Sequence, residues 1–166
     1  MNWTKKSIAK LSFFIIVCEA VGASGSVFTA PSIPTWYASL TKPFFNPPSW
    51  LFGPAWTVLF ALMGVSLYLV WEKGSKNKKL KDRKFREALF AFGMQFALNV
   101  LWSFLFFGLR SPLYALVEII FLWVAIAVTI FKFYKISRTA SFILVPYLAW
   151  VSFAAVLNYY VWILNL

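Results

Sequence analysis

The stretch ALFAFGMQFALNVLWSFLFFGL, residues 88–109, decides the fold of this chain. It contains no charged residue, and roughly 20 apolar residues are enough for a helix to cross a bilayer. Four other apolar stretches of comparable length lie before and after it. We predict an all-α integral membrane protein: a single domain over residues 1–166, built as a bundle of five transmembrane helices at about residues 8–30, 54–72, 88–109, 112–132 and 140–164.

The composition supports a membrane protein and excludes an ordinary soluble domain. Hydrophobic residues make up 61% of the chain and charged residues 13%, with a mean hydropathy of +0.75. Soluble domains are about half apolar and about a quarter charged. The net charge of +11 could suggest a nucleic-acid partner, but the cations cluster between the apolar stretches rather than along one face. We therefore expect the lipid bilayer as partner and no nucleic acid.

The cations also predict the orientation in the cell membrane. The N-terminus and residues 72–87 and 132–139 share one side of a five-helix protein, and together they carry 14 of the 16 Lys and Arg residues. Cytoplasmic loops are enriched in Lys and Arg. We expect a multi-pass protein with its N-terminus in the cytoplasm, and with the first loop and the C-terminus outside. The basic loop 72–87 is either a solvated topogenic loop or a lipid-binding patch.

The first loop is unusually stiff and aromatic. The sequence WYASLTKPFFNPPSWLFGPAW, residues 36–56, combines four prolines with many rings. Proline fixes φ, and Trp and Tyr favour the membrane interface. We expect residues 31–53 to form a loop, with Pro54 and Pro112 in the first turns of the helices that follow them. Pro146 lies one turn inside the fifth apolar stretch and is expected to kink it.

Two carboxyl groups lie inside predicted spans, where each is costly to insert. Glu19 and Glu118 could be neutral acids that form hydrogen bonds between helices. Alternatively, they could bind a ligand or take part in proton transfer. The sequence contains no histidine, and its only cysteine, Cys18, lies in an apolar stretch. We therefore expect no metal site and no obligatory cofactor.

Three predicted helices each have one face that mixes aromatic rings with an occasional amide. Helical spacing groups these residues as Trp56 and Phe60, then Gln95, Asn99, Trp102 and Phe106, then Trp150, Phe153, Ala154 and Leu157. Each face could contact lipid or another helix. Three such faces in one small bundle favour a pocket for a flat lipophilic ligand. Small residues such as Gly22 and Gly25, and the pair Gly93 and Ala97, predict close helix contacts within the bundle or between subunits.

The motifs resemble those of the TspO/MBR family, which comprises the bacterial tryptophan-rich sensory protein and the mitochondrial translocator protein. The resemblance rests on Trp36-Tyr37, Lys42-Pro43 and Pro47-Pro48, on Gln95 and Asn99, on Glu118, and on PYLAWVSFAAVLNYYVW at residues 146–162. It covers nearly all of the chain except residues 1–30 and the basic loop.

The resemblance implies a five-helix bundle with an outward-opening cavity covered by the first loop, and a homodimer. It implies a porphyrin or haem-type tetrapyrrole as ligand. The motifs, together with Trp102 and Glu118 from the faces above, give these candidate ligand-binding residues: Trp36, Tyr37, Trp56, Phe60, Gln95, Asn99, Trp102, Glu118, Trp150, Phe153, Ala154 and Leu157.

Three functions remain open at this point. The first is a receptor or sensor for flat lipophilic molecules. The second is an enzyme that degrades porphyrin under light, with Trp36, Trp56 and Trp150 as electron donors. The third is a facilitated transporter of tetrapyrroles or lipids. The segment VLNYYVWILNL, residues 156–166, has no cation after its tyrosines, so the sterol pattern proposed for the family is incomplete and we expect a prokaryotic source.

Overall fold

The computed structural model describes residues 4–76 and 83–166, and all the regular secondary structure of these residues is helical. Residues 77–82, the centre of the basic loop, lie outside the described residues, so the choice between a topogenic loop and a lipid-binding patch is not settled there. The helices are α1 (Lys5–Ser32), η1 (Ile33–Tyr37), α2 (Ser49–Lys76), α3 (Arg83–Ser103), η2 (Phe104–Gly108), α4 (Pro112–Tyr134), α5 (Arg138–Ile143) and α6 (Val145–Ile163).

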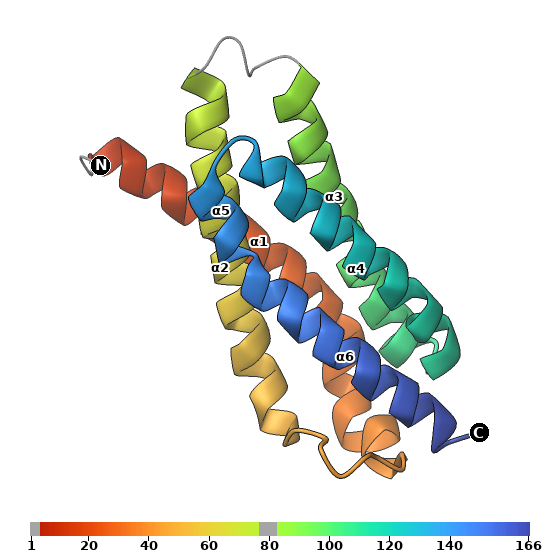
Figure 1. The fold of residues 1–166 in the computed structure, drawn as a ribbon. Helices are drawn as coiled ribbons and strands as arrows, with labels where there is room; N and C mark the ends of the chain where they lie inside the picture. The colour runs from red at the N-terminus through yellow and green to blue at the C-terminus, as the bar shows by residue number, and fades with distance from the viewer. Residues whose placement is uncertain (1–3, 77–82) are drawn as a thin grey trace.

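The helices form five spans, each long and apolar enough to cross a bilayer. The predicted all-α bundle is therefore confirmed. Figure 1 shows the spans packed into one bundle, with the N-terminal turns of α1 projecting from its side and the fifth span made of α5 followed by α6. α1 packs on α2, α3 packs on α4, and α4 packs on α6.

The two ends of the bundle differ in chemistry. At one end Lys10 pairs with Glu72 at 3.1 Å, and Lys132 pairs with Glu87 at 2.8 Å. We call this the charged end. At the other end, residues 40–48 cross from η1 to α2 without helical structure, near the C-terminus (Figure 1). We call residues 40–48 the lid, and this end of the bundle the lid end.

The lid is shorter than the loop predicted at residues 31–53. α1 continues to Ser32 although it contains Pro31, and a π-helical turn, η1, follows it. α2 begins at Ser49, so Pro54 lies inside the helix and not in its first turn. That prediction was wrong because the five residues before Pro54 add a turn at the start of α2, and a proline in the first turns disrupts few helical hydrogen bonds.

The other two proline predictions are confirmed. Pro112 occupies the first turn of α4, where Ser111 accepts a hydrogen bond from the Tyr114 N–H at 3.4 Å. The fifth span breaks at Leu144, between α5 and α6, and Pro146 lies in the first turn of α6. A proline cannot donate to the preceding turn, so the helix restarts there.

α1 and α2 approach each other most closely at Gly64. A Cβ atom added to Gly64 would lie 2.6 Å from Ile15 Cα and 2.9 Å from Ile15 N, which are backbone atoms. Toward the lid end, Gly22 packs against the ring of Phe60, since its added Cβ would lie 2.3 Å from that ring. The small residues predicted on the first helix therefore do make helix contacts within the bundle.

Gly93 and Ala97 on α3 behave differently. Both are exposed, and a Cβ atom added to Gly93 would meet nothing within 4 Å. Their small side chains therefore face away from the rest of this chain, toward lipid or a second subunit. The homodimer stays a prediction.

Candidate ligand cavity

A cavity of about 390 Å³ lies between α1, α2, α3 and α6 in the half of the bundle nearer the lid. Ligand pockets usually measure about 300–1,000 Å³ and are mostly apolar. The wall includes residues of each of these helices and of both π-helical turns: Gly22, Ser26, Thr29, Ile33, Tyr37, Phe52, Trp56, Thr57, Phe60, Asn99, Trp102, Phe106, Phe107, Trp150, Ala154, Leu157 and Asn158.

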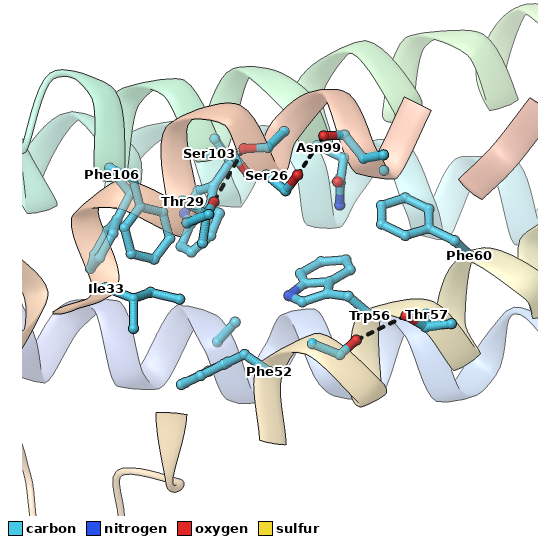
Figure 2. A pocket seen from close by; sticks show the side chains of 18 of the residues that line it. Ser26, Thr29, Ile33, Phe52, Trp56, Thr57, Phe60, Asn99, Ser103 and Phe106 are labelled. Atoms are coloured by element: carbon cyan, nitrogen blue, oxygen red, sulfur yellow. Dashed lines mark hydrogen bonds between the residues drawn. The ribbon is translucent and has the colours of Figure 1, made fainter. Parts of the chain in front are cut away.

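Eight of the described residues that line the cavity carry aromatic rings, and these rings pack on one another. Trp56 stacks on Phe60, with ring centroids 5.5 Å apart, and meets the buried Tyr147 edge-on at 6.2 Å. On the wall formed by α3 and η2, Trp102 stacks on Phe106, with ring centroids 5.1 Å apart. Figure 2 shows the Trp56 indole projecting into the centre of the cavity from α2. Because the rings hold one another, the wall offers flat apolar faces in fixed positions.

Few polar groups face the cavity, and most already have partners. Asn99 Nδ2 donates to Tyr147 Oη at 3.0 Å. Trp102 Nε1 donates to Asn158 Oδ1 at 3.2 Å, and Asn158 Nδ2 donates to the Pro112 carbonyl at 2.8 Å. On α1 the Ser26 hydroxyl donates to its own helix, to the Ala23 carbonyl at 2.6 Å (Figure 2). A ligand here must gain its affinity mainly from ring contacts and apolar burial.

Both π-helical turns border the cavity. η1 contributes Ile33 and Tyr37, and η2 contributes Phe106 and Phe107. The Ser32 hydroxyl joins the two turns by donating to the Phe107 carbonyl at 3.0 Å. A π-helical turn adds a residue to the helix and so rotates the side chains that follow, and such turns often occur at functional sites.

The lid is fastened at both of its edges. Tyr37 Oη donates to Asn46 Oδ1 at 2.7 Å. Asn165, beyond α6, accepts from the Thr41 N–H and donates to the Thr41 carbonyl, both at 2.9 Å. Phe45 packs edge-on against Tyr160 at 5.3 Å. These contacts close the cavity toward the lid end.

The opening of the cavity lies on one flank. Among the lining residues, the exposed ones come from α1 and α2: Ala23, Ser26, Ala30, Gly53 and Thr57. α1 and α2 touch closely at Gly64 and separate toward the lid (Figure 1). The cavity therefore opens sideways between these helices, whereas the family resemblance implied an outward-opening cavity covered by the first loop.

Eight of the predicted ligand-binding residues line this cavity: Tyr37, Trp56, Phe60, Asn99, Trp102, Trp150, Ala154 and Leu157. The other four do not. Trp36 packs against Phe106 from outside, with centroids 5.5 Å apart, and Phe153 lies beneath the lid, 6.3 Å from Phe45. Gln95 and Glu118 are buried elsewhere in the bundle. The role of the eight in binding stays a prediction.

Gln95 and Glu118 stand out for another reason. Gln95 is 1% exposed and Glu118 5%, and within the described residues neither side-chain oxygen of Glu118 nor either polar atom of the Gln95 side chain has a hydrogen-bond partner. Burying such groups unpaired costs free energy. Gln95 lies one turn before Asn99 on the same side of α3, deeper in the bundle than the cavity, and Glu118 lies on α4, none of whose described residues lines the cavity.

Sequence reasoning missed the contribution of α1. Gly22, Ala23, Gly25 and Ser26 form part of the cavity wall, whereas their small size predicted only helix contacts. The signal was present in part, since a stripe of small residues also leaves room beside a helix. Phe52 was missed because residues 49–53 were expected to belong to the loop.

The comparisons with known proteins agree with these motifs. The TspO/MBR family model matches residues 14–163. The chain is 48% identical to the tryptophan-rich protein TspO of Archaeoglobus fulgidus over 159 residues, which cover 96% of this chain and 99% of the relative. It is 44% identical to the protein of the same name of Chlorobaculum tepidum over 160 residues, which cover 96% and 98% of the two chains.

The similarity extends to eukaryotes. The translocator protein of Homo sapiens is 41% identical over 131 residues, which cover 76% of this chain and 73% of the human protein. The region that the family model matches, residues 14–163, includes the lid, both π-helical turns and most or all of every helix that lines the cavity. The family model matches this five-helix membrane bundle over nearly its whole length. The chain therefore belongs to the TspO/MBR family.

Proposed function

We propose that this protein is a membrane receptor or sensor that binds porphyrin-type tetrapyrroles and other flat lipophilic molecules in the cavity. The observation that carries the proposal is the fixed arrangement of Trp56, Trp102 and Trp150, whose rings from three helices face one space. The family supports it, since relatives bear the names tryptophan-rich sensory protein and translocator protein.

The size and the position of the opening restrict how such a ligand would bind. About 390 Å³ is near the lower limit for ligand pockets. A whole macrocycle therefore needs either the lid to move or one edge to extend between α1 and α2. The extending edge would meet the Ser26 and Thr57 hydroxyls and then the bilayer. Apolar ligands would thus enter from the membrane and not from water.

The test is a titration of the purified protein with protoporphyrin in darkness, followed by tryptophan fluorescence. We expect saturable quenching at micromolar ligand. Trp56→Ala should weaken binding roughly tenfold, because an aromatic contact contributes about 0.5–1.5 kcal/mol beyond its buried area. Trp50→Ala is the matched control, since Trp50 is 71% exposed and outside the cavity wall. Absence of saturation, or equal losses in both variants, would reject the proposal.

Two further arms separate the alternative functions. Illumination of the complex should leave the porphyrin absorption unchanged. A new absorbing product that is lost in Trp150→Phe would instead indicate a light-dependent enzyme. Vesicles that contain the protein should equilibrate porphyrin no faster than protein-free vesicles; faster equilibration would indicate transport.

We also propose that the charged end faces the cytoplasm and the lid faces outside. The basis is the distribution of cations described above. Phe44 is 100% exposed in the lid, and Lys84 is exposed near the start of α3. In a Cys18→Ser background, a membrane-impermeant maleimide should label Phe44→Cys but not Lys84→Cys in intact cells. The reverse pattern would invert the orientation.

A further inference from the structure

A second hollow, of about 280 Å³, lies on the outer surface between α3 and α4, away from the ligand cavity. Its lining comes from Phe90, Ala91 and Met94 on α3 and from Ala125 and Val128 on α4. Glu87 and Lys132 border it where these helices reach the charged end. We call this hollow the α3–α4 groove. It is apolar along its length and charged at one end.

The groove has the geometry of a site for a hydrocarbon chain. Ala91 and Ala125 are small and leave the groove between the larger side chains of Phe90, Met94 and Val128, which are 70%, 44% and 41% exposed. From Lys132 to Ala125 the groove runs seven residues along α4, or about 10 Å. One leaflet of a bilayer provides about 15 Å of hydrocarbon, half of a core about 30 Å thick. The groove is thus open to lipid and shorter than one acyl chain.

The charges at the end of the groove are organised around one carboxylate. Glu87 Oε1 accepts from Arg83 Nε at 2.7 Å, and Glu87 Oε2 accepts from Lys132 Nζ at 2.8 Å. Both cations remain accessible, because the Arg83 side chain is 91% exposed and the Lys132 side chain 31%. An added anion could therefore reach either of them without displacing a buried group.

More cations continue the same helical stripes. Lys84 stands three residues before Glu87 on α3, and Lys135 stands three residues after Lys132 beside α4. Residues three apart lie on one side of a helix. Among the described residues near this end, the cations Arg83, Lys84, Lys132 and Lys135 outnumber the carboxylate of Glu87, so the net charge is positive at the level where lipid headgroups lie. Basic pockets between transmembrane helices suit anionic headgroups.

We propose that the α3–α4 groove binds one anionic phospholipid of the leaflet at the charged end. Its phosphate contacts Lys132 and Arg83, and one acyl chain lies along Ala91 and Ala125. A zwitterionic phospholipid fits the same groove but gains less from the cations. The proposal does not depend on what the ligand cavity binds.

The test uses the delipidated full chain in neutral detergent, titrated with dioleoyl phosphatidylglycerol or dioleoyl phosphatidylcholine. Native mass spectrometry counts the first bound lipid. We expect phosphatidylglycerol to bind about tenfold tighter. Lys132→Gln combined with Arg83→Gln should weaken phosphatidylglycerol about 25-fold, roughly fivefold per cation, and leave phosphatidylcholine unchanged. Lys5→Gln combined with Lys6→Gln, exposed cations on α1, is the charge-matched control and should change nothing.

Two single variants test the site further. Glu87→Gln removes the competing carboxylate and should tighten phosphatidylglycerol several-fold. If the ion pairs of Glu87 only stabilise the fold, the affinity of this variant for phosphatidylglycerol is lower or unchanged, and the proposal fails. Ala125→Phe fills the groove and should weaken both lipids, whereas Ala20→Phe, at an exposed position on α1, should weaken neither.

Other outcomes also overturn the proposal. Equal affinity for the two lipids, or an equal loss in the Lys5 and Lys6 control, would mean that only the general charge of the protein matters. Displacement of phosphatidylglycerol by millimolar glycerol phosphate would mean that the groove holds no acyl chain. A dimer that dissociates in Ala125→Phe would mean that a second copy occupies the groove. An unchanged midpoint of thermal unfolding in each variant verifies that the variant is folded.

Discussion

The close crossing of α1 and α2 gives a quantitative prediction for Gly64→Ala. The new Cβ atom would lie 2.6 Å from Ile15 Cα and 3.0 Å from the Phe14 carbonyl oxygen. Carbon atoms in contact stay about 3.5–4.0 Å apart, so the helices must separate by about 1 Å. The obstructing atoms belong to backbone and cannot rotate away. Overpacking of this kind costs about 1–3 kcal/mol.

The assay is thermal unfolding in detergent, followed by tryptophan fluorescence. For a chain of this size, 1 kcal/mol corresponds to roughly 2–4 °C, so Gly64→Ala should lower the midpoint by roughly 2–12 °C. Gly93→Ala is the matched control, because its added Cβ meets nothing within 4 Å. It lies inside α3, where alanine favours helix by about 1 kcal/mol, so its midpoint should rise. If both variants shift the midpoint alike, the crossing is not in backbone contact and the reasoning is wrong.

Three other predictions concern the lid, the α3–α4 turn and the buried carboxyl group. Asn165→Ala removes both hydrogen bonds to Thr41 and should increase hydrogen–deuterium exchange in residues 40–48 roughly tenfold; unchanged exchange would show that Asn165 does not hold the lid. Arg110 has φ of 52°, which Asn tolerates better, so Arg110→Asn should raise the unfolding midpoint in detergent by a few degrees, and a fall would contradict this. Glu118→Gln should keep or raise the midpoint and change porphyrin affinity less than threefold in the fluorescence titration, because Glu118 has no hydrogen-bond partner among the described residues and does not line the cavity. A tenfold loss of affinity would place it in the binding site after all.

Sequence patterns located most of the cavity because helical spacing is fixed. Trp56 and Phe60 are four residues apart, and so are Trp150 and Ala154; each pair lies on one side of its helix and lines the cavity. Spacing alone failed for Phe153, which belongs to the same face as Trp150 but lies under the lid. A face on a helix spans more than 100°, so the pattern indicates a direction and not which residue touches the ligand.

The π-helical turns could not be predicted. Tyr37 of η1 and Phe107 of η2 line the cavity, whereas Trp36, also in η1, does not. Pro31 and Pro34 disrupt helical hydrogen bonds around η1, but a proline does not by itself specify a π-helical turn. The Ser32 to Phe107 hydrogen bond joins residues 75 apart in sequence, so the two turns depend on contacts that form only in the folded bundle.

The sequence by itself determined the five spans, the all-helical architecture, the family and the separation of a charged end from an aromatic end. The spans follow from local composition, because crossing a bilayer requires about 20 apolar residues whatever the neighbouring helices are. The charged end follows from the positions of the cations, and the family follows from local motifs. Only the tertiary structure decided that the cavity opens between α1 and α2, that Gln95 and Glu118 lie outside it, and that α3 and α4 leave a groove on the surface. Those features depend on the rotation and crossing of helices distant in sequence, which are set by packing at contacts such as Gly64 against Ile15.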